Sequence, residues 1–171
     1  MFFAVSRPWM VVLALAFGAM VSVLPHGAKA QVTAFKQAVA EAAARDADIS
    51  AFYKANGYES LWTGRSGRER QRRTALFAAL SKAADHGLPT ARYDAGGLQA
   101  KMKAAQTERD RGLVEVEISR TFLQYSRDLQ TGVLVPSRVN RSIVRAVPYR
   151  DRTSYLVNFS KSSPNGFFKA L

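Results

Sequence analysis

The stretch from Thr107 to Gly132, TERDRGLVEVEISRTFLQYSRDLQTG, decides the fold of this chain. Its apolar side chains recur at steps of four, four, three and four residues: Val114, Ile118, Phe122, Tyr125 and Leu129. That spacing places them on one face of a helix. Thr107 is a good N-cap and Gly132 a good C-terminal stop. We therefore predict one long amphipathic helix, with the rest of the fold built against its apolar face.

The segments before and after this helix also favour helices. We expect a helix over 32–45, a second one capped by Asp48 and ended by Asn56–Gly57, and a third from Ser66 to His86–Gly87. Asp94 caps a short fourth helix, 153–159 forms another, and Ser163–Pro164 begins the last. Val133-Leu134-Val135 is the one strand-like stretch. The predicted fold class is mainly α, with at most one or two short strands.

Residues 1–30 have the pattern of a signal peptide. Arg7 gives a positive start, 9–24 is an uncharged apolar run of about 16 residues, and Ala28-Lys29-Ala30 matches a cleavage site. The run is short for a bilayer span, which needs about 20 residues. We expect cleavage after Ala30, no stable membrane span afterwards, and a mature domain of residues 31–171 in a bacterial periplasm.

Composition excludes several kinds of chemistry. The chain has 171 residues, no cysteine and two histidines. It therefore has no thiolate nucleophile, disulfide or cysteine-ligated metal, and too few histidines for a three-histidine site. No Ser-centred nucleophile motif accompanies His86, which fits the end of a helix. We predict no catalytic residue, no cofactor and no metal site.

Positive charge is the clearest candidate for function. Lys and Arg number 25 against 13 Asp and Glu, a formal charge of +12. Beside Arg65, four arginines form the candidate polyanion-binding set: Arg68, Arg70, Arg72 and Arg73. A second set follows the strand-like stretch: Arg138, Arg141, Arg145, Arg150 and Arg152. The alternative is a solvated basic face. Nucleic acid is not expected, because no binding motif is present and the chain is expected to be exported.

Other polar and aromatic candidates favour structural roles. Glu115 and Glu117 lie two residues apart, on different faces of a helix, so they do not form an acid–base pair together. Glu117 and Thr121 share a face near Tyr125, which favours a buried polar cluster. The helical spacing of the aromatic residues favours core packing over a sugar platform: Phe52, Tyr53, Tyr58 and Trp62.

Three ordered stretches resemble the N-terminal scaffold region of the large periplasmic murein L,D-transpeptidases. They are FYKANGYESLW at 52–62, ALSKAADHGLPTARYDAGGL at 79–98 and EISRTFLQYSRDLQTGVLV at 117–135. The last contains the family's Y-x-x-D-L-x-x-G pattern at Tyr125, Asp128, Leu129 and Gly132. The resemblance covers most of residues 46–171.

The resemblance implies a non-catalytic scaffold of an enzyme that cross-links peptidoglycan. The family's catalytic signature, His…Ser-x-Gly-Cys-x-Arg, is not in this sequence, so no catalytic residue is carried over. We expect a scaffold truncated at its C-terminal end, whose partner is its own missing catalytic module. In that case the apolar residues Phe167, Phe168 and Leu171 face that module, and the isolated domain exposes apolar surface.

Two alternatives stay open. One is a complete basic periplasmic module that binds an anionic cell-wall polymer, peptidoglycan or a membrane surface. The other is a cysteine-free lytic glycosidase that uses Glu117.

Overall fold

The computed structural model describes Met1 and residues 33–134, 136–140, 142, 148 and 150–171. Within these residues the chain is helical and has no strand, so the mainly α prediction is confirmed. Val133 and Leu134 form no strand, and Val135 lies outside the described residues. The predicted signal peptide also lies outside them, apart from Met1, and stays a prediction.

Most helices follow one another as the sequence predicts, but the third ends at Ser81 and gives way to a 3₁₀ turn before His86–Gly87. The sequence also does not predict the short helical segments Thr90–Arg92 and Pro136–Val139. In chain order they are α1 (Ala34–Ala43), α2 (Ala47–Ala55), α3 (Gly67–Ser81), the 3₁₀ turns η1 (Ala83–His86) and η2 (Thr90–Arg92), α4 (Ala95–Ala104), α5 (Glu108–Thr131), α6 (Pro136–Val139), α7 (Arg152–Lys161) and α8 (Pro164–Ala170). Among the described ranges, no helix has the length and apolar character needed to cross a bilayer.

Side-chain caps explain where several helices begin. Thr107 and Asp110 form a reciprocal capping box at α5, and Asp94 accepts from the backbone N–H of Gly97 at α4. Ser66 is the N-cap of α3 as predicted. The predicted cap of α2 is wrong by two residues, because Asp46 accepts from the backbone N–H groups of the first turn and Asp48 lies inside the helix.

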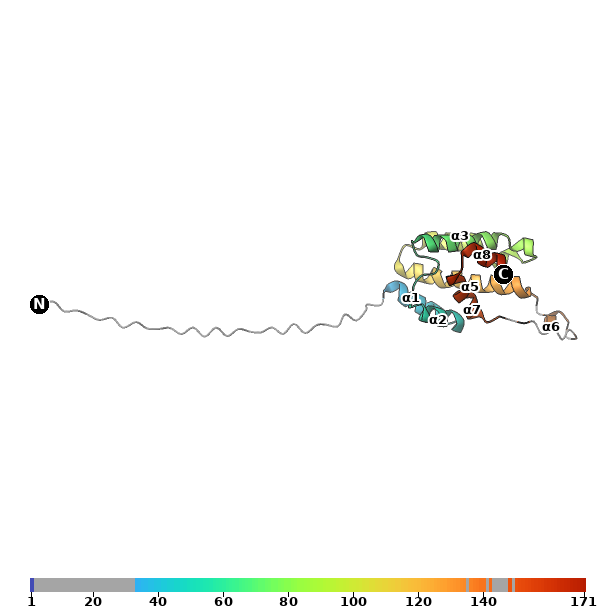
Figure 1. Cartoon of the computed structure of the whole chain (residues 1–171), viewed down its shortest axis with the longest axis horizontal. Coiled ribbons are helices and arrows are strands. Elements are labelled where there is room, and N and C mark those ends of the chain that lie inside the picture. Colours follow the sequence, from blue (N-terminus) through green and yellow to red (C-terminus); the bar gives the residue numbers. More distant parts are fainter. Residues whose placement is uncertain (2–32, 135, 141, 143–147, 149) are drawn as a thin grey trace. The chain divides into compact units, whose positions relative to one another are not determined.

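α5 is the central helix of the described part of the chain from residue 33 onward. Figure 1 shows α3 on one side of α5 and α1 and α2 on the other. Gly112 lets α1 approach closely: a Cβ there would lie 2.7 Å from the carbonyl oxygen of Phe35 and 2.8 Å from Cβ of Ala38. The apolar face of α5 contributes Val114, Ile118, Phe122 and Tyr125 to the buried core. The long-helix prediction is thus confirmed.

An aromatic cluster joins α5 to the last two helices. Phe159 of α7 packs 4.9 Å from Phe122 and 5.1 Å from Trp62 between ring centroids. Phe167 of α8 lies 5.1 Å from Phe159, and Phe168 lies 6.3 Å from Tyr125. Both rings thus contact the chain's own core and are partly buried there.

Leu171 is placed in a similar way. It is half-buried and packs against the same core cluster. All three residues remain partly exposed, so a seam between them and another module stays a prediction.

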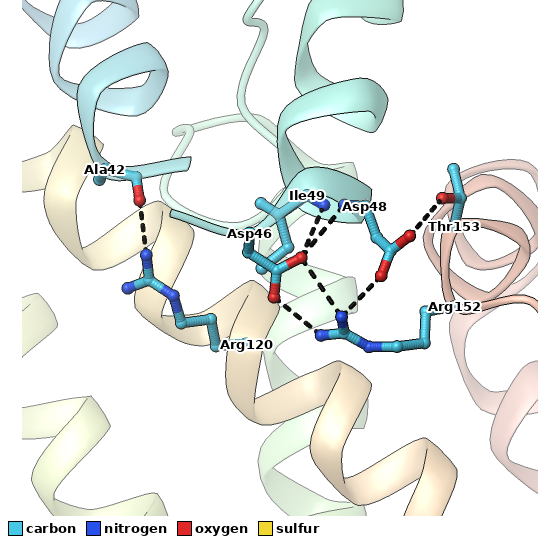
Figure 2. A network of polar contacts seen from close by, with 7 residues as sticks. All are labelled: Ala42, Asp46, Asp48, Ile49, Arg120, Arg152 and Thr153. Carbon is cyan, nitrogen blue, oxygen red and sulfur yellow. Dashed lines mark hydrogen bonds and ion pairs between the residues drawn. The ribbon is translucent and has the colours of Figure 1, made fainter. Parts of the chain in front are cut away.

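Polar contacts hold α7 against α2 (Figure 2). The Arg152 guanidinium donates to Asp46 at 2.8 Å and to Asp48 at 2.6 Å. On the other side of this network, Arg120 of α5 donates to the carbonyl oxygen of Ala42 at 2.5 Å. These contacts join the two ends of the described scaffold, about a hundred residues apart in sequence.

Candidate functional site

A fully buried carboxylate on α5 organises the loop between α2 and α3. Glu115 accepts from three consecutive backbone N–H groups, at 2.5 Å from Leu61, 3.0 Å from Trp62 and 2.7 Å from Thr63. The hydroxyls of Thr63 and Tyr53 donate to it at 2.7 and 2.8 Å. These donors replace the water that a buried carboxylate loses. Glu115 therefore fixes the position of residues 61–63.

The network continues through Tyr53 and Ser119. Because the Tyr53 hydroxyl proton goes to Glu115, Ser119 donates to Tyr53 at 2.8 Å and accepts from the indole N–H of Trp62 at 2.8 Å. Burial and the neighbouring Glu115 charge raise the pKa of Tyr53 well above its ordinary value. Tyr53 thus stays a neutral donor at every physiological pH.

Two of the four predicted arginines also hold this region from α3. Arg73 donates through Nη1 to the carbonyl oxygens of Trp62 and, at 2.8 Å, Gly64. Arg72 is buried and donates at 2.6 Å to the carbonyl oxygen of Ser160 in α7. Burial lowers the pKa of both guanidinium groups, but both remain charged. Arg72 and Arg73 are therefore structural supports of the loop and of α7.

The other two arginines of the predicted set face solvent. Arg68 is exposed, and its guanidinium has no hydrogen bond or ion pair within the described part of the chain, while Arg70 donates to the carbonyl oxygen of Arg65 at 2.5 Å. The structure therefore divides the four residues into a pair that bonds to the chain's interior, Arg72 and Arg73, and a pair exposed to solvent, Arg68 and Arg70. Polyanion binding stays a prediction, and its accessible members are Arg68 and Arg70, together with the exposed Arg65.

The described members of the second arginine set also differ in exposure and pairing. Arg138 and Arg150 are exposed, Arg152 pairs with Asp46 and Asp48, and Arg141 and Arg145 lie outside the described residues. One member, Arg152, is thus structural.

The remaining candidates occupy ordinary structural positions. Glu117 pairs with Lys101 at the α4–α5 surface, so the predicted buried cluster around Glu117 is wrong, and Glu115 is the buried carboxylate instead. His86 is exposed at the end of η1. Phe52, Tyr53 and Trp62 are buried in the core, as their spacing indicates.

A second buried carboxylate lies in the Y-x-x-D-L-x-x-G segment of α5. Asp128 accepts from the Tyr93 hydroxyl at 2.9 Å and from Gln124 at 2.7 Å, and pairs with Arg92 at 2.8 Å. Burial and the bond to Asp128 raise the pKa of Tyr93. This cluster ties the segment around η2 to α5.

Sequence reasoning missed Glu115 although a signal was present. Glu115 precedes Ile118 by three residues and Phe122 by seven, which places it on the apolar face of the helix. Its partners, by contrast, lie 52 to 62 residues earlier in the chain, so the sequence does not show them. Among the described residues, no group of three or more His, Cys, Asp or Glu side chains is placed to hold a metal ion.

The sequence matches a model of a known protein family. A family model described as the Scaffold domain matches residues 47–171. The match covers most of the chain, so this protein belongs to the Scaffold domain family. Neither the curated proteins nor the solved structures that were compared gave a match.

Proposed function

We propose that this chain is the non-catalytic scaffold portion of a murein L,D-transpeptidase, acting in the periplasm in peptidoglycan cross-linking and cell-wall biogenesis. It supports a catalytic module of the same protein, and that module forms the 3→3 links. The observation that carries the proposal is the Scaffold domain match over residues 47–171, together with three transpeptidase-like stretches in the same order.

The positions that carry the resemblance also build the fold. Tyr53 and Trp62 belong to the Glu115 network, and Tyr93 bonds to Asp128. Tyr125 donates to the carbonyl oxygen of Ala79 at 3.0 Å and so joins α5 to α3. Residues with such contacts define a stable platform, which supports a role in positioning another module rather than in chemistry.

The absence of cysteine from the sequence assigns the reaction to another segment. The attacking group of the L,D-transpeptidases is a cysteine thiolate, and this chain has no cysteine. In the proposal, the chain's own contribution is therefore mechanical: it holds the catalytic module and its substrate path in place.

Analysis of the native protein tests this proposal. We expect the mass of the periplasmic product, and the gene read beyond codon 171 in all three frames, to reveal a His…Ser-x-Gly-Cys-x-Arg segment joined to this scaffold. A native product that ends without such a segment would overturn the proposal.

The second candidate function is a basic module that binds an anionic wall polymer or membrane surface. The formal charge of +12 and the exposed Arg65, Arg68 and Arg70 favour it. It predicts binding to sacculi or anionic vesicles that falls steeply with salt and with the double change Arg68→Ala and Arg70→Ala. An affinity that changes neither with salt concentration nor with these substitutions would contradict it.

A further inference from the structure

A surface hollow of about 460 Å³ adjoins the loop that Glu115 holds. Four arginines line it: Arg65 of the loop, Arg70 and Arg73 of α3, and Arg111 of α5. Two apolar residues at the C-terminal end of α4 also line it, Met102 and Ala105. In the described part of the chain, no acidic side chain lines this hollow. The charges thus converge from separate elements and are not a single run along one helix face.

Backbone contacts hold two of these arginines without neutralising them. Arg73 uses Nη1 for the carbonyl oxygens of Trp62 and Gly64, and Arg70 uses one of its own N–H groups for that of Arg65. Neither guanidinium pairs with a carboxylate among the described residues. A guanidinium has five N–H donors, so both retain donors for a further acceptor.

The two remaining arginines differ in exposure and pairing. Arg65 is exposed, and its guanidinium has no hydrogen bond or ion pair within the described ranges. Arg111 pairs with Glu108, and both arginines also line an adjoining hollow of about 360 Å³ whose lining includes Glu59 and Glu108. Glu108 thus offsets the charge of Arg111. Arg65, Arg70 and Arg73 pair with no carboxylate among the described residues, so the basic hollow keeps an excess of positive charge.

We propose that this hollow binds an oxyanion, a carboxylate or phosphate group, attached to an apolar portion that packs on Met102 and Ala105. Guanidinium groups match both anions through parallel N–H···O bonds. Arg65 and Arg111 contact the anion, and Arg73 holds the loop that carries Arg65. The inference goes beyond the scaffold role and does not depend on it.

Titration of the purified full chain with small probes tests the site. The probes are hexanoate, its neutral counterpart hexanamide, and inorganic phosphate, with binding followed by calorimetry at fixed ionic strength. We expect hexanoate, phosphate or both to bind, and hexanamide not to bind. Comparison of the affinities of hexanoate and phosphate then shows whether the site prefers a carboxylate or a phosphate. Arg65→Ala and Arg111→Ala should each weaken binding at least about tenfold, as the loss of a charge-assisted hydrogen bond predicts.

Arg68→Ala is the matched control. It removes the same charge from the same region but does not line the hollow, so binding should change less than about twofold if the contact is local. Arg65→Lys, which keeps the charge without the planar fork, should fall between the wild-type chain and Arg65→Ala. Equal losses for Arg65→Ala and Arg68→Ala, binding of hexanamide as strong as that of hexanoate, or no binding of either anion at millimolar concentration would each overturn the proposal.

Discussion

At the scale of single residues, the Glu115 carboxylate is the group on which residues 61–63 depend. Glu115→Gln keeps the shape but turns one acceptor into a donor that faces backbone N–H groups. We expect it to lower the free energy of unfolding by about 3 kcal/mol, because buried donors lose their charged partner. Urea denaturation followed by circular dichroism measures the change.

Glu117→Gln is the matched control for this substitution. Glu117 lies two residues further on, but it is half-exposed and pairs with Lys101 at the surface. We expect a loss below about 1 kcal/mol. Equal effects of the two substitutions would contradict the assigned role of Glu115.

At the scale of helices, Gly112 sets the distance between α1 and α5. Gly112→Ala places a methyl group 2.7 Å from the backbone carbonyl oxygen of Phe35, which has little freedom to shift. We expect a net loss of about 1–3 kcal/mol on denaturation, although alanine favours a helix by about 1 kcal/mol.

Gly96→Ala on α4 is the control, because here the added methyl group should not lower the free energy of unfolding. A Cβ at Gly96 meets only Asp94, at 4.0 Å, so the substitution should be neutral or slightly stabilising. If Gly112→Ala also proved neutral, the close approach of α1 to α5 would be wrong.

The contact between α2 and α7 should depend on pH. Burial raises the pKa of Asp46, but hydrogen bonds from Arg152 and the backbone of Ile49 outweigh it, so the pKa lies below its ordinary 3.8. Asp46 therefore contributes stability above about pH 4 that is lost as the pH falls through its lowered pKa. Asp46→Asn keeps the N-cap but removes the charge pair with Arg152.

Denaturation of both proteins at pH 7, 5 and 3 measures this dependence. We expect the wild-type chain to be more stable at pH 7 and 5, and the difference to shrink as the pH falls to 3. A difference that stays constant over this range would show that the Asp46 charge does not stabilise the contact.

The helices could be predicted better than the site. The apolar periodicity of α5 and the caps Thr107, Asp94 and Ser66 are local, so the sequence shows them. The inward positions of Arg72 and Arg73 depend on carbonyl oxygens of the 62–64 loop and α7, which no local pattern reveals. The packing of Phe167 on Phe159 is likewise tertiary.

At the scale of the whole molecule, the described residues from 33 onward form one helical body around α5. Glu115, Asp128 and the Arg152 contacts join distant parts of the chain into one body. The chain belongs to the Scaffold domain family, and the role beside a catalytic module is our proposal.

Exchange of scaffold domains tests this central claim most directly. In a strain that lacks other L,D-transpeptidases, the scaffold of one such enzyme is replaced by residues 31–171 of this chain, which keep α1, or deleted. The 3→3 cross-linked muropeptides are then quantified by mass spectrometry. We predict that the exchanged protein forms these links, while its Cys→Ala variant and the deletion do not. An exchanged protein that is as abundant as the parent enzyme but forms no more links than the deletion would contradict the account.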